Sequence, residues 1–145
     1  MRQFSRALPA ILTIFLLTAC SSSPPPAGRW YGAYEDSALI IVARLEIDSA
    51  GVVRVSAPNA TITSADMSKV DRADLRAKLE DGLASSWPSV APLPLEFDGH
   101  AFHKPGGVAP QLEWNASAGR MTLVYYANNR PAIRVALDPV KNFDT

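Results

Sequence analysis

The two histidines of this chain are the side chains best suited to metal binding or acid–base chemistry. His100 and His103 lie in one short segment, close to the carboxylate of Asp98. A metal site would need both imidazoles to converge on one point. The dipeptide Asp98-Gly99, however, stands between two β-prone runs. It predicts a hairpin turn rather than a helix that would bring both rings together.

A two-residue turn would set the register of this hairpin. It would pair Phe97 with His100, and the next pair would be Leu95 with Phe102. Successive side chains of a strand point to opposite faces, so His100 would share a face with Phe102 while His103 points to the other. We therefore expect His100 to flank the turn, His103 to face solvent, and the segment to bind no metal.

Neighbouring carboxylates are the other candidates for acid–base chemistry. Glu35 stands beside Asp36, and Glu96 stands close to Asp98. Each pair falls at a predicted turn, and the sequence indicates no apolar pocket around it that would shift a pKa. The chain also lacks a Gly-x-Ser-x-Gly elbow, a phosphate-binding glycine loop and a His-Glu-x-x-His zinc helix. We expect a protein that is not an enzyme and holds no cofactor.

Cys20 is the only cysteine of the chain. A single cysteine excludes internal disulfides and zinc sites built from several thiolates. It follows the apolar run Ala7–Leu17, which a short basic head with Arg2 and Arg6 precedes. This run has the length of the apolar part of a secretory signal and is too short to cross a bilayer as a helix.

The residues Leu17-Thr18-Ala19-Cys20 resemble the lipobox of bacterial lipoproteins. The resemblance implies that residues 1–19 are a signal peptide that is removed, that the sulfur of Cys20 takes a diacylglycerol, and that the new amine is acylated. Two or three acyl chains hold a protein stably at a membrane, whereas one chain gives only marginal binding. The alternative is an ordinary cleaved secretory signal in which Cys20 has no role.

Residues 20–27 form a linker that comprises the lipidated cysteine and a Ser/Pro tract. Three successive prolines favour an extended polyproline II path, and the tract has no apolar side chains that would order it. Ser21 stands where an Asp would resemble a signal for retention in the inner membrane. We therefore expect an outer-membrane anchor that faces the periplasm, followed by a single β-rich globular domain over residues 28–145.

The charge balance excludes a nucleic-acid partner. The chain has 14 basic and 14 acidic residues, and the predicted signal removes Arg2 and Arg6 from the basic set. No segment of the remaining, slightly acidic chain collects enough Lys and Arg to attract an anionic polymer.

Hydrophobic side chains in the predicted domain mostly alternate with a period of two, which is the period of β-strands. The Asp48–Gly51 and Asn128–Pro131 segments have the composition of turns. Two predicted strands flank each of these turns, one strand precedes the first hairpin and one precedes the second. The predicted strands cover residues 28–34, 39–47, 53–56, 111–115, 121–126 and 133–137.

One segment departs from this period. Leu75, Leu79, Leu83 and Trp87 fall four residues apart and predict a helix over residues 71–86, with Asp71 as the N-cap. We expect this leucine stripe to pack against the sheet, because an isolated helix of this length is marginally stable. The alternative is a helix whose stripe binds a partner. The predicted fold class is α+β and mainly antiparallel β, with a small curled sheet or barrel and one amphipathic helix packed against it.

Gly28-Arg29-Trp30, at the start of the first predicted strand, resembles the opening of lipocalin-type β-barrels. In that family the tryptophan plugs one barrel end and an arginine of the last strand often covers it. The resemblance implies that role for Arg134. The mid-chain position of the predicted helix departs from the late helix of the family.

We expect a membrane-anchored lipoprotein of the cell envelope that acts by binding another envelope component. The alternative function is a carrier of a small apolar ligand inside a lipocalin-like barrel. The two functions differ in whether large inward side chains fill the interior or line a hole. The side chains concerned are Trp30, Tyr34, Phe97, Phe102, Trp114 and Tyr125.

Overall fold

The structure is a computed structural model that describes residues 23–56 and 59–143. Its elements follow in the order β1 (Gly28–Glu35), β2 (Leu39–Ile47), β3 (Val53–Val55), β4 (Asn59–Ile62), α1 (Lys69–Ser86), the 3₁₀ turn η1 (Trp87–Ser89), β5 (Glu96–Phe97), β6 (Ala101–His103), β7 (Pro110–Asn115), β8 (Arg120–Ala127) and β9 (Arg130–Val140).

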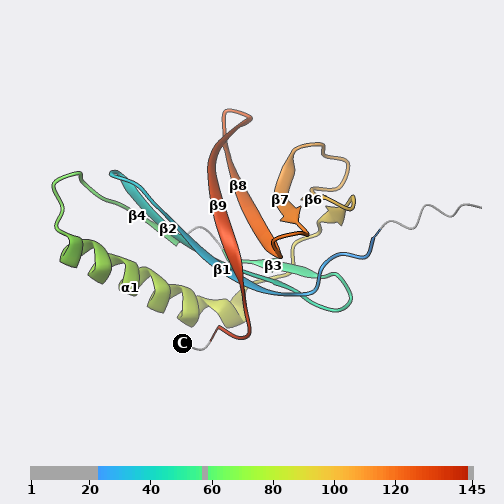
Figure 1. Cartoon of the computed structure of the whole chain (residues 1–145), viewed down its shortest axis with the longest axis horizontal. Coiled ribbons are helices and arrows are strands. Elements are labelled where there is room, and N and C mark those ends of the chain that lie inside the picture. The colour runs from blue at the N-terminus through green and yellow to red at the C-terminus, as the bar shows by residue number, and fades with distance from the viewer. Residues whose placement is uncertain (1–22, 57–58, 144–145) are drawn as a thin grey trace, which may run out of the picture.

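The strands form one antiparallel sheet in the order β3-β2-β1-β9-β8-β7-β6-β5, and β4 pairs with the first part of β2. The sheet curls into a half-barrel, and α1 lies along one side of it (Figure 1). The backbone N–H of Leu93 donates to the carbonyl of Val53 at 2.8 Å, so the β3 edge is tied to the segment before β5. The predicted fold class is confirmed.

Two of the hairpins follow directly from their turn residues. The carboxylate of Asp48 accepts the backbone N–H groups of Ala50 and Val52, which fixes the turn between β2 and β3. Asn128 and Asn129 both adopt positive φ angles, 51° and 60°, as the tight turn between β8 and β9 requires. The predicted meander at the C-terminal end is therefore present as β7, β8 and β9.

The inner face of the curled sheet carries the main core. Alternate residues of β2, from Ile41 to Ile47, join residues of β1, β3 and β6–β9 in one buried cluster. The six large inward side chains belong to this cluster or pack against it. Trp30 and Phe102 are fully buried, while Tyr34, Phe97, Trp114 and Tyr125 are partly buried around them.

A second, smaller apolar layer lies on the opposite face of β2. Ile40 and Val42 are fully buried but do not belong to the main cluster, because their side chains point the other way. α1 covers this face, and Leu83 is the one residue of the helix that is fully buried, at 1% exposure. Leu75 and Leu79 are half-buried. The leucine stripe therefore packs against the sheet, as predicted, with its tightest contact at the C-terminal end of the helix.

The predicted start of the helix is wrong by two residues. The N-cap is Ser68, whose hydroxyl accepts the backbone N–H of Asp71 and donates to the carboxylate of the same residue. Serine with an acidic residue three positions on is the capping-box arrangement, so Asp71 acts within the first turn rather than at the cap. Among the described residues, no helix is both long and apolar enough to cross a bilayer.

Trp30 is buried as the lipocalin resemblance implies, but Arg134 does not cover it. The indole N–H donates to the carbonyl of Gly119 at 3.0 Å, and the ring meets Trp114 edge-on. Trp30 pairs with Pro139 on β9, and Arg134 lies an odd number of positions away, on the other face of that strand. Arg134 forms an ion pair with Glu113 on the outer face instead.

The backbone of β9 lies close to Gly32 of β1. A Cβ atom at this position would lie 2.0 Å from the carbonyl oxygen of Ala136 and 2.8 Å from a methyl group of Leu137. Gly32 has no positive φ angle, so its role is space alone. The absence of a side chain at Gly32 lets the first and last strands meet.

Tyr125 predicts an unusual alkaline dependence of stability. Burial raises its pKa to about 12, and its buried hydroxyl has no hydrogen-bond partner among the described residues. An unfolded chain ionises tyrosine near pH 10. The stability that this difference contributes is present below about pH 10 and is lost as the pH rises toward 12.

We expect the melting temperature of Tyr125→Phe to fall less between pH 9 and pH 11 than that of the wild type, because the phenol that ionises on unfolding is absent. At pH 8 the melting temperature should not decrease, because the change removes an unpaired polar group. Thermal unfolding followed by circular dichroism measures both effects. Tyr126→Phe is the control, since its hydroxyl donates to the carbonyl of Pro110 at 2.8 Å and its loss should cost about 1 kcal/mol. An unchanged alkaline slope in Tyr125→Phe would contradict the prediction.

Candidate functional site

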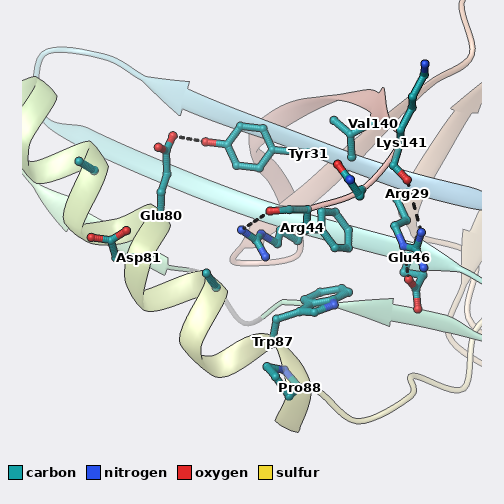
Figure 2. Close-up of a pocket in the computed structure, with 14 residues that line it drawn as sticks. Arg29, Tyr31, Arg44, Glu46, Glu80, Asp81, Trp87, Pro88, Val140 and Lys141 are labelled. Carbon is teal, nitrogen blue, oxygen red and sulfur yellow. Dashed lines mark hydrogen bonds and ion pairs between the residues drawn. The ribbon is translucent and has the colours of Figure 1, made fainter. Parts of the chain in front are cut away.

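A hollow of about 1230 Å³ lies between α1 and the outer face of the sheet. We call it the helix–sheet groove. β1, β2, α1, η1 and the end of the chain after β9 all contribute to its walls (Figure 2). The lining residues are Arg29, Tyr31, Arg44, Glu46, Ala77, Glu80, Asp81, Ala84, Trp87, Pro88, Val140, Lys141, Asn142 and Phe143.

The sheet wall of the groove is a polar cross-strand ladder. Arg29 lies opposite Glu46, and Tyr31 lies opposite Arg44, in the register of β1 with β2. Side chains alternate along a strand, so this wall is the reverse of the face that carries Trp30 into the core. The Nε atom of Arg29 donates to Glu46 at 2.6 Å, which holds that part of the wall together.

The helix wall consists of residues on one face of α1, spaced three or four apart. They are Ala77, Glu80, Asp81 and Ala84. Figure 2 shows Tyr31 and Glu80 directed toward each other from the sheet and the helix, where the phenol donates to the carboxylate. Glu80 also accepts from the Nε atom of Arg76 at 2.9 Å. This carboxylate therefore connects the two walls.

The two connecting groups have shifted pKa values in opposite directions. Burial raises the pKa of Tyr31, and the hydrogen bond to Glu80 raises it further. Burial opposes ionisation of Glu80, but the hydrogen bonds from Tyr31 and Arg76 outweigh it and lower the pKa of the carboxyl. At neutral pH the pair is a neutral phenol and a carboxylate, which is a stable structural link.

An aromatic cluster closes one end of the groove. The ring of Phe143 meets Trp87 edge-on, with 4.8 Å between the centroids and 69° between the planes. The guanidinium carbon of Arg44 lies 4.9 Å from the centroid of Phe143, and that of Arg54 lies 6.0 Å from the centroid of Trp87. Edge-on rings and cations over ring faces are both favourable contacts.

Among the described lining residues, Arg44 is the one with a buried side-chain atom that has no hydrogen-bond partner. Its Nη2 atom donates to the carbonyl of Phe143 at 3.3 Å, while its buried Nε atom has no partner among the described residues. No carboxylate of the described residues lies within ion-pair distance of the Arg44 guanidinium. A buried donor without an acceptor is unfavourable, so an additional acceptor in the groove would be stabilised here.

The histidine hairpin has a different register from the predicted one. Phe97 pairs with Phe102 rather than with His100, and Glu96 pairs with His103. The reason is Asp98, whose carboxylate accepts backbone N–H groups and so widens the turn to four residues. His100 is exposed in that turn.

His103 does point away from Phe102, but it does not face solvent. Its side chain is 16% exposed, and its Nε2 atom lies 2.8 Å from the carboxylate of Asp98. Backbone N–H groups of His100 and Ala101, and then His103, lower the pKa of Asp98 to about 2. This carboxylate is a turn cap that also orients one imidazole.

A smaller hollow of about 460 Å³ lies beside this hairpin, lined by Glu96, Phe97, Asp98, His103, Gly107 and Val108. The described residues contain no group of three or more His, Cys, Asp and Glu side chains arranged to hold a metal ion.

The other carboxylate pair has structural partners. Asp36 accepts the backbone N–H groups of Ala38 and Leu39 in the turn after β1. Glu35 forms an ion pair with Arg72 of α1 at 3.2 Å. The two carboxylates thus fasten the turn and the helix. Cys20, the predicted lipidation site, lies outside the described residues.

The helix–sheet groove was not predicted from the sequence, although one signal for it exists. Arg29, Tyr31, Arg44 and Glu46 alternate with core residues along two predicted strands, which defines one polar sheet face. A polar strand face is normally solvated, so this pattern alone does not indicate a site. Trp87 has the four-residue spacing of the leucine stripe but lies against Phe143 in the groove, which its spacing does not indicate.

Comparison with known protein families, with curated proteins and with solved structures finds no match to this chain.

Proposed function

We propose that this protein is a lipid-anchored component of the bacterial cell envelope that acts without catalysis, by binding another envelope component in the helix–sheet groove. The observation that carries the binding role is the groove itself. It combines an aromatic cluster with one buried donor that lacks an acceptor among the described residues, the Nε atom of Arg44. Such a mixture of aromatic and arginine side chains is typical of surfaces that bind other proteins.

The anchoring role rests on the lipobox-like residues Leu17–Cys20. We propose that Cys20 carries the lipid and that the linker over residues 20–27 extends the domain away from the membrane. Ser21 after the cysteine favours the outer membrane, with the domain in the periplasm.

Carriage of a small apolar ligand inside the barrel is the weaker proposal. It rests on the resemblance of Gly28-Arg29-Trp30 to lipocalin-type barrels. The six large inward side chains, which would have to line a hole in a carrier, belong to the main core or pack against it. Phe97 and Phe102, for example, have ring centroids 4.7 Å apart. Contacts this close favour a filled interior, so the outer face is the better candidate for binding.

Site-specific photocrosslinking in intact cells tests the proposed function. A photoreactive amino acid at Ala84 would lie on the helix wall of the groove, and its exposed position should accept the change. We expect it to form a discrete crosslinked product with an envelope component. The same group at Ala116, which is exposed in the turn after β7 and outside the groove, is the matched control and should give no such product.

The anchor is tested in the same cells. Cys20→Ala should abolish incorporation of a fatty-acid probe and remove the Ala84 crosslink, because the protein no longer stays at the membrane. Undiminished fatty-acid label on Cys20→Ala would contradict the anchor, and equal crosslinking from Ala84 and Ala116 would contradict the groove as binding site.

A further inference from the structure

We propose that the helix–sheet groove binds a polypeptide segment with an aromatic side chain, and that the protein's own segment Lys141–Phe143 occupies this place until such a partner displaces it. The inference rests on the proposed function, since it names the class of ligand for the same groove. It begins from the fact that this segment forms part of the groove lining and is held there by arginines of the sheet wall.

The way in which the groove holds this segment indicates a peptide ligand. Arg29 donates to the carbonyl of Lys141 at 3.4 Å, and Arg44 donates to the carbonyl of Phe143 at 3.3 Å. The segment bends at Lys141 and at Phe143, and the two arginines, on neighbouring strands of the sheet wall, each hold one of its backbone carbonyls. A hydrogen bond to a backbone carbonyl is a contact that any sequence can make.

The aromatic cluster supplies the side-chain preference. Phe143 is half-buried between the indole of Trp87 and the guanidinium of Arg44. Arg54 lies over the ring of Trp87 and donates to the carbonyl of Val90, so this wall of the cluster is held in place independently of Phe143. A partner that presents an aromatic ring could replace Phe143 without rearrangement of the wall.

The resident segment is held in a way that allows exchange. The last strand pair between β9 and β1 joins Val140 to Arg29, and no ladder pair follows it. Lys141–Phe143 is therefore attached by two long hydrogen bonds and one aromatic side chain. Its release would leave the sheet, the main core and the packing of Leu83 intact.

The resident segment also leaves a polar group unsatisfied that a partner can use. The buried Nε atom of Arg44 lacks an acceptor although Phe143 lies directly against the guanidinium. A longer or differently placed peptide can bring a further carbonyl to this atom. This additional hydrogen bond would strengthen the binding of a partner. It would offset the high effective concentration of the resident segment, which is attached to the same chain.

A peptide-binding experiment tests the proposal on the full chain. The probe is a fluorescein-labelled synthetic peptide with the sequence of residues 138–145, and fluorescence anisotropy measures its binding. In the wild-type chain the resident Phe143 competes with the probe, whereas in Phe143→Ala the aromatic place is vacant. We expect the peptide to bind Phe143→Ala at least about tenfold more tightly than the wild type, since apparent affinity scales with the fraction of molecules whose site is open.

The matched control changes the ligand rather than the protein. The same peptide with its phenylalanine replaced by alanine should lose most of its affinity for the Phe143→Ala chain. Both peptides are tested on the same protein, so an effect of the substitution on folding cannot explain the difference. Circular dichroism of Phe143→Ala should match the wild type. Equal affinity of both chains for the probe, equal affinity of both peptides, or no binding of either peptide would overturn the proposal.

Two further outcomes separate this proposal from the proposed function. A crosslink from Ala84 in cells, together with no peptide binding, would leave the groove as a binding site but reject an aromatic peptide as its ligand. Concentration-dependent dimers of the wild-type chain that disappear in Phe143→Ala would show exchange of the segment between two copies, and would overturn its role as an occupant within one chain.

Discussion

Gly32→Ala should destabilise the protein strongly, so that it unfolds at a clearly lower urea concentration than the wild type. The new methyl group would lie 2.0 Å from the carbonyl oxygen of Ala136, a backbone atom that cannot move without separating β1 from β9. Overpacking of this kind typically costs about 1–3 kcal/mol, and a clash with backbone places the effect at the upper end. Since small domains are stable by only about 5–15 kcal/mol, we expect a clear shift of the urea midpoint.

Gly82→Ala is the matched control for this change. Gly82 lies in α1, and a Cβ there would meet only the side-chain amide of Asn59, at 3.3 Å. The effect on the free energy of unfolding should stay within about 1 kcal/mol. If Gly32→Ala and Gly82→Ala lowered the free energy of unfolding by similar amounts, the contact of β1 with β9 at Gly32 would not be the cause of the destabilisation.

Leu83→Ala should be the most damaging truncation within α1. This side chain is 1% exposed between the helix and β2, and its removal leaves a cavity beside Ile40 and Val42. Truncation of a buried leucine costs about 2–5 kcal/mol. Urea unfolding followed by far-ultraviolet circular dichroism measures this loss.

Val70→Ala provides the comparison on the same helix, because Val70 is 70% exposed. It should change the free energy of unfolding by no more than about 0.5 kcal/mol. If Leu83→Ala were equally mild, the helix would not derive its position from the small apolar layer on the outer face of β2.

The hairpins and the helix could be predicted from the sequence because residues close to one another along the chain determine them. The alternation along β2 and the turn residues Asp48, Asn128 and Asn129 specify two hairpins without reference to the rest of the chain. The spacing of the leucines likewise specifies the helix. Its first residue was misplaced because Ser68 and Asp71 are both good capping residues, and only the backbone conformation distinguishes them.

The register of the histidine hairpin shows where local reasoning fails. Asp98-Gly99 is a strong signal for a two-residue turn, but the Asp98 side chain accepts two backbone N–H groups and forms a longer turn. The pairing of Phe97 with Phe102, whose rings lie against each other and pack into the core, supports the longer form. Core packing and the hydrogen bonds of Asp98 thus determine the register, rather than the preference of Asp-Gly for a two-residue turn.

The groove could not be predicted because four stretches of the chain that are distant in sequence form it. Tyr31 and Glu80 meet only once α1 lies on the outer face of the sheet, and Phe143 reaches Trp87 only after β9 has paired with β1. Each residue alone resembles an ordinary surface or helix-end residue. The polar face of the sheet is visible in the sequence, but the sequence does not indicate which helix or segment packs against it.

The pairing of β1 with β9 has a kinetic consequence. Arg29 and Lys141 meet although they stand 112 positions apart, and the pairing of β1 with β9 joins the first and the last of the described strands within the sheet. Contacts between residues so distant in sequence slow folding, because a long loop must close before they form. The hairpins on either side of this pair join residues that are close in sequence and can form without it. The two halves of the sheet join only when Val140 pairs with Arg29, so we expect this pairing to form late in folding.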